Sequence, residues 1–80
     1  MDWITDITMR LATETKLDPA DLLVDADDKN TLLDLAGVAA HASGDRTNAP
    51  ILCHILGRAI ARGATLEECA LVIGDFAGDK

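Results

Sequence analysis

The apolar residues of this chain recur at three- and four-residue spacing, and helix start and stop signals separate the runs. Ile4, Ile7 and Leu11 show this spacing in the first run. It is typical of amphipathic helices, because 3.6 residues per turn bring such positions to one face. The hydrophobic fraction of 49% contains one Trp, one Phe and no Tyr, which favours helices over a sheet. The sequence predicts an all-α protein, in which residues 1–80 form a single domain folded as a compact orthogonal bundle of four to five helices.

Helix-capping residues place the boundaries of these helices. Asp2 is a suitable N-cap for the first helix, and Asn48 for the helix that carries Pro50 in its first turn. Thr65 and Glu68 have the spacing of a capping box, in which each side chain bonds the backbone amide of the other residue. The predicted elements are long helices over about 3–15, 29–42 and 49–62, a short helix between Asp18 and Asp25, and a last helix after Thr65.

The inward-facing positions of these helices predict the core. Trp3 is expected to cover one end of the core, and Phe76 to face inward from the last helix. The predicted core residues are Leu32, Leu35, Leu52, Ile55, Leu56, Leu66 and Ile73.

The net charge of −7 argues against a nucleic-acid backbone or an anionic membrane as partner. The sequence shows neither a secretion signal at its start nor an apolar run of the roughly 20 residues that span a bilayer. We therefore expect a cytoplasmic protein. Cys53 and Cys69 should stay reduced there and pack as small apolar groups.

Metal sites find little support in the sequence. The acidic run after Asp25 has Asn30 at the sixth position of a calcium loop, where Gly is needed, and Ala36 at the twelfth, where Glu is needed. Cys53 and His54 are adjacent on a helix, so their side chains diverge by about 100° and cannot form the paired ligands of a zinc site. We predict no metal and no cofactor.

Cysteine catalysis is the other chemistry considered. Cys53 could meet His41 across the helical hairpin, but a nucleophile also needs an orienting group and an oxyanion site. The sequence has no Gly-rich loop to supply one. We predict that the chain is not an enzyme.

Positive charge is concentrated in one part of this acidic chain. Residues 35–66 carry one acid, Asp45, against three arginines, whereas the rest of the chain is formally −9. Two interpretations stay open: a solvated face that pairs with acids of neighbouring helices or of a second subunit, and an anion-binding or docking surface. The candidate residues for the second are His41, Arg46, Asn48, His54, Arg58 and Arg62.

The stretch AHASGDRTNAPI, residues 40–51, contains the start of this basic region. Free backbone amides at the start of the third long helix would favour an anion, and Arg46 is close enough in sequence to contribute. Arg58 and Arg62 lie two to three turns further along, so only an extended ligand or an acidic partner surface would reach them. A phosphate-bearing small molecule and an acidic protein partner are the two alternatives.

Self-association is expected as well. An 80-residue chain buries only about 60% of the surface its unfolded form exposes, so its core is thin. The small residues of AGVAAHA, residues 36–42, would allow another helix to approach closely. These features favour a homodimer in which one patch meets its own copy.

Several motifs together resemble a known family: LDP at 17–19, LLDLAGVAAH at 32–41, the AP that opens a helix at 49–50, and GRAIARGA at 57–64. The chain resembles small uncharacterised actinobacterial domains that occur alone or appended to the molybdenum-cofactor guanylyltransferase. Members more often carry Gly where this chain has Lys16. The resemblance implies a non-catalytic accessory role near molybdenum-cofactor assembly.

Overall fold

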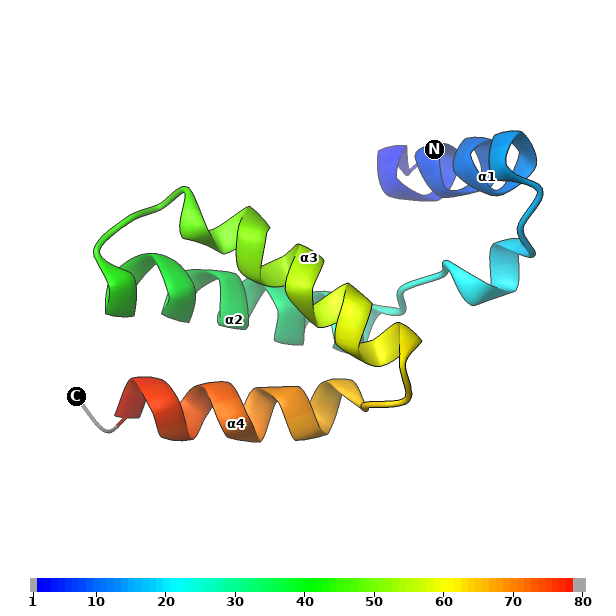
Figure 1. Ribbon diagram of the computed structural model, residues 1–80. Helices are drawn as coiled ribbons and strands as arrows, with labels where there is room; N and C mark the ends of the chain where they lie inside the picture. Colours follow the sequence, from blue (N-terminus) through cyan, green and yellow to red (C-terminus); the bar gives the residue numbers. More distant parts are fainter. Residues whose placement is uncertain (1, 79–80) are drawn as a thin grey trace.

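The computed structural model describes residues 2–78, and every regular element in that range is helical, which confirms the all-α prediction (Figure 1). In chain order the elements are α1 (Trp3–Thr15), the 3-10 helix η1 (Pro19–Asp21), α2 (Ala26–Ser43), α3 (Asn48–Ala61) and α4 (Leu66–Gly78). No helix in this range is both long enough and apolar enough to cross a membrane.

Short-range hydrogen bonds from capping side chains fix most of the helix starts. The Asp2 carboxylate accepts from the Thr5 amide at 3.3 Å, and the Asp25 carboxylate accepts from the Asp28 amide at 2.8 Å. Because Asp25 caps α2, this helix begins three residues earlier than predicted.

The predicted capping box of α4 is confirmed. The Glu68 amide donates to Thr65 Oγ1 at 3.1 Å, and the Thr65 amide donates to Glu68 Oε1 at 2.8 Å. The prediction for α3 is wrong by one residue, because Thr47 is the N-cap and makes no side-chain capping bond. Asn48 is instead the first residue of α3, and its Nδ2 donates to Ser43 Oγ at 3.0 Å across the turn.

The core lies between α2, α3 and α4, which run back and forth beside one another (Figure 1). Leu35, Leu56 and Leu66 are buried at its centre, one from each helix. Five of the surrounding side chains are partly buried against them: Leu32, Leu52, Cys69, Ala70 and Ile73. Six of the seven predicted core residues are therefore confirmed.

Two residues that were expected to face inward do not. Ile55 is 53% exposed and Phe76 is 71% exposed. Both helices have more apolar positions than one core face can cover, so part of each apolar surface faces away from the core.

Helix α1 lies apart from this three-helix core. Among the described elements it packs only against η1, which buries Ala12 (Figure 1). The prediction that Trp3 covers the core is wrong, since its side chain is 71% exposed. The molecule is elongated as a result. Its radius of gyration is 13.8 Å, whereas a compact 80-residue domain should have about 12 Å.

Candidate functional site

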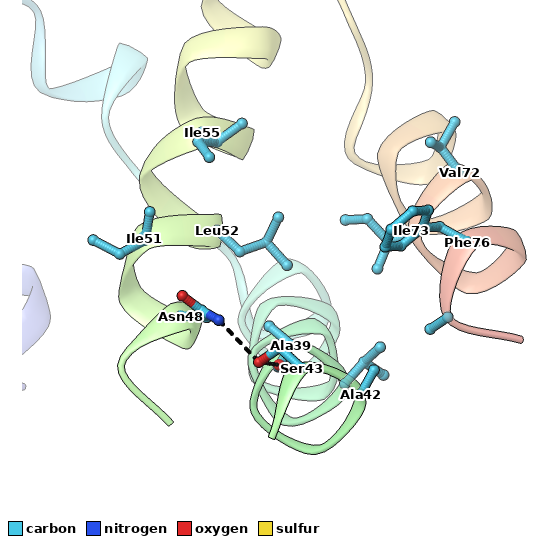
Figure 2. Close-up of a pocket in the computed structure, with 12 residues that line it drawn as sticks. Ala39, Ala42, Ser43, Asn48, Ile51, Leu52, Ile55, Val72, Ile73 and Phe76 are labelled. Carbon is cyan, nitrogen blue, oxygen red and sulfur yellow. Dashed lines mark hydrogen bonds between the residues drawn. The ribbon is translucent and has the colours of Figure 1, made fainter. Parts of the chain in front are cut away.

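An apolar groove lies between α3 and α4, at the end of the bundle where α2 ends and α3 begins (Figure 2). Its volume is about 670 Å³. Leu52 from α3 and Ile73 from α4 point toward one another across it, and small side chains of α2, including Ala39 and Ala42, lie at its floor. The other large apolar side chains that line it are Val38, Ile51, Ile55, Val72 and Phe76. We call this surface the apolar groove.

The large apolar side chains at the edges of the apolar groove are unusually exposed to solvent. Ile51 is 59% exposed and Val72 is 67% exposed, in addition to Ile55 and Phe76. Isolated apolar residues at a surface are common, but a contiguous patch around a concave groove is typical of a binding site.

The polar side chains in the lining of the apolar groove are engaged with their own chain. Ser43 Oγ donates to the Ala39 carbonyl oxygen at 2.6 Å and accepts from Asn48 Nδ2 (Figure 2). The lining contains no acid, base or thiol, and no base that lines the groove stands beside the Ser43 hydroxyl, so the groove offers mainly packing surface.

The sequence-predicted basic residues do not converge on one point. Arg46 lies in the turn before α3, while Arg62 follows the end of α3, and Asn48 and Arg62 are about 21 Å apart along the helix axis at 1.5 Å per residue. Both are exposed, as are His41 near the end of α2, His54 and Arg58.

The spacing of residues on α3 relates two of these arginines to the apolar groove. Ile51, Ile55, Arg58 and Arg62 follow one another at intervals of four, three and four residues, so they lie along one stripe of the helix. Between residues 2 and 78 the one ion pair is Arg10 with Glu14, at 3.1 Å. Arg58 and Arg62 therefore have no ion-pair partner within residues 2–78, so the structure does not show this face pairing with acids of neighbouring helices.

The expectation of free amides at the start of α3 is wrong. The Thr47 amide donates to Asp45 Oδ1 at 2.9 Å, and the Asn48 and Ala49 amides donate to backbone carbonyl oxygens of Asp45 and Arg46 at 3.1 Å. Pro50 has no amide proton to donate. Bonds from the Thr47 side chain and amide also lower the pKa of Asp45, so a carboxylate of the chain itself is held at this position.

Neither cysteine is among the residues that line the apolar groove. Cys53 lines a second pocket with Leu32 and Gly57, to which His41 does not contribute, while Cys69 packs against the core. Within the part of the chain that the structure describes, no three His, Cys, Asp or Glu side chains are grouped as metal ligands would be.

Fold and surface together define a class: a small all-α domain with an apolar groove and a basic stripe on one helix. The chain belongs to the family described as "Domain of unknown function (DUF6457)", whose model matches residues 1–77. Neither the curated proteins nor the solved structures include a match to the chain.

Sequence reasoning missed the apolar groove because it assigned Leu52, Ile55, Ile73 and Phe76, which line the groove, to the core. A signal was present in α4, where Leu71, Val72 and Ile73 are consecutive apolar residues. Three consecutive residues point in three directions around a helix, so they cannot all face a single core. The groove is where some of this surplus apolar surface is placed.

Proposed function

We propose that this chain is a non-catalytic helical interaction module whose docking surface is the apolar groove. The observation that carries the proposal is the exposure of the groove-lining side chains of α3 and α4, which leaves apolar surface uncovered by any described part of the chain. An amphipathic helix laid into an apolar groove is a common recognition mode, and its binding free energy comes from burying such side chains.

The test uses two neighbouring residues of α4. Val72 lines the apolar groove and is 67% exposed, whereas Leu71 is 72% exposed and is not part of the lining. Immobilised wild-type chain, exposed to a lysate of the source cells, should retain at least one protein, the chain itself included. Val72→Asp should lose that protein and Leu71→Asp should keep it. Equal retention by the two variants would show that the groove is not the docking surface.

The setting that we propose for this module is molybdenum-cofactor assembly. The support is the resemblance, most specific over residues 33–64, to domains found alone or appended to the molybdenum-cofactor guanylyltransferase. Two free cysteines fit a reducing cytoplasm, which we propose as the compartment. In the capture experiment, this proposal expects the guanylyltransferase among the retained proteins, and a captured set without any cofactor-assembly protein contradicts it.

A second candidate function is the binding of a phosphate-bearing anion by the surface that carries Arg46, Arg58 and Arg62. The observation that favours it is the absence of an ion-pair partner for these arginines within residues 2–78. Titration with pyrophosphate and guanine nucleotides, followed by amide NMR shifts, should move residues 46–51 and weaken with Arg46→Ala. If millimolar ligand moves none of these amides, the arginines belong to a protein interface.

A further inference from the structure

Helix α1 has an apolar face that its own chain leaves open. Trp3, Ile4 and Leu11 are 71%, 48% and 50% exposed, and together with Ile7 they span about 100° of the helix circumference. A helix of 13 residues is only marginally stable alone in water and needs tertiary packing to persist. Among the described elements, η1 alone supplies it. The open face of α1 therefore needs a partner.

The apolar groove of the same chain lies too far from α1 to cover its open face. The groove is formed where α2 ends and α3 begins, whereas α1 joins the opposite end of α2 through residues 16–25 (Figure 1). From Ala26 to Ser43, α2 spans about 26 Å at 1.5 Å per residue. A second copy arranged antiparallel to the first would instead bring its α1 to this groove.

The exposed surface of the chain is as large as a dimer of this kind requires. A compact folded chain of 8.5 kDa should expose about 4,700 Å², and this chain exposes 6320 Å². The excess is roughly 1,600 Å² per chain, or roughly 3,200 Å² for two copies, which lies within the 2,000–5,000 Å² typical of obligate homodimers.

Charge gives the orientation of the docked helix. With its N-cap, α1 carries Asp2, Asp6 and Glu14 against Arg10 and is formally −2, while residues 46–66 contain no acid and are formally +3. An antiparallel arrangement of α1 on α3 that sets Leu11 beside Ile55 brings Asp6, about 7.5 Å earlier along α1, level with the segment from Arg58 to Arg62. It also sets the two helix dipoles in opposite directions.

Resting on the proposed function of the apolar groove, we propose its occupant: α1 of a second copy docks antiparallel to α3 in this groove, and the exchange is reciprocal. The resulting two-fold dimer is closed, because the copy that receives α1 of the first copy also donates its own α1 to that first copy.

Disulfide trapping tests the exchange in the full-length chain. Two singly substituted chains, Leu11→Cys and Ile55→Cys, are prepared in a background with both native cysteines changed to Ser, and are mixed under mild oxidation. The matched control replaces Leu11→Cys by Thr13→Cys, which lies outside the open apolar face of α1. We expect the mixed disulfide of Leu11→Cys with Ile55→Cys to form at least about tenfold faster than that of the control.

Sedimentation of the wild-type chain at tens of micromolar accompanies this experiment and separates the outcomes. A dimer with selective trapping supports the exchange. If the chain is a dimer and the two mixed disulfides form equally, α1 is not the occupant, although the groove can still be the interface. A monomer overturns the exchange outright, and the interaction module is then judged by the Val72→Asp and Leu71→Asp capture alone.

Discussion

Lys16 ends α1 in the left-handed backbone conformation, with φ of 61°, and it is the one described residue other than Gly with positive φ. The conformation lets the Lys16 and Leu17 amides bond the last carbonyl oxygens of α1. It is strained for any residue with a Cβ atom and natural for Gly, which is the usual residue at this point of a helix end.

Replacing Lys16 by Gly should therefore stabilise the fold. The left-handed conformation costs an L residue about 1–2 kcal/mol, so Lys16→Gly should raise the free energy of unfolding by about 1 kcal/mol after the added flexibility of the unfolded chain is subtracted. Urea denaturation measures the change. Lys16→Ala keeps the Cβ atom and should show no such gain; equal gains from both variants would contradict the strain argument.

The pKa of Asp28 reflects the acidic residues that lie near it at the N-termini of α2 and α4. Its pKa is raised above 3.8, first by desolvation and then by the negative charges of Asp25, Glu67 and Asp27. Because the folded state holds this proton more tightly than the unfolded state does, Asp28 contributes to stability at low pH, and this contribution is lost as pH rises and Asp28 ionises.

Asp28→Asn removes the repelled charge and keeps the backbone amide that Asp25 caps. The melting temperature of the variant should exceed that of the wild type at pH 7, and the two should converge near pH 3, where the wild-type carboxyl is protonated. A gain of the same size at both pH values would show that charge is not its cause.

At the scale of the elements, adjacent residues of α3 have different roles. Leu56 is 4% exposed in the core, and Ile55 is 53% exposed at the apolar groove. Leu56→Ala should lower the free energy of unfolding by about 2–5 kcal/mol. In dilute solution Ile55→Ala should lower the free energy of unfolding by about 1 kcal/mol or less, because the fold of the monomer buries less than half of this side chain. Chemical denaturation of the two variants compares them, and equal losses would mean that the inward face of α3 is assigned wrongly.

The sequence was sufficient for most of the helix boundaries and for most of the core. Caps such as Asp2 and the pair of Thr65 and Glu68 act through residues three positions away, so local pattern predicts them. The division of apolar residues between core and groove depends on where α2 and α4 cross α3. Ile55 and Phe76 were misassigned because that crossing is a tertiary property.

At the scale of the whole molecule, the position of α1 was beyond sequence reasoning. Its apolar periodicity predicts a helix and an apolar face, but does not say which surface covers that face. Among the described elements, α1 packs against η1 alone. The apolar face of α1 and the apolar groove are both uncovered, and we propose that they contact one another between two copies.

The central claim is that a second copy covers α1, and amide hydrogen exchange of α1 as a function of protein concentration tests it most directly. If the helix docks on a second copy, exchange of residues 3–15 should slow severalfold between about 0.1 μM and about 50 μM, since protection then follows the dimer population. Amides in the middle of α2 and α3 should already be protected at the lower concentration by the core around Leu35 and Leu56. Exchange rates of α1 that are the same at both concentrations, in a chain that sediments as a monomer, would contradict the account.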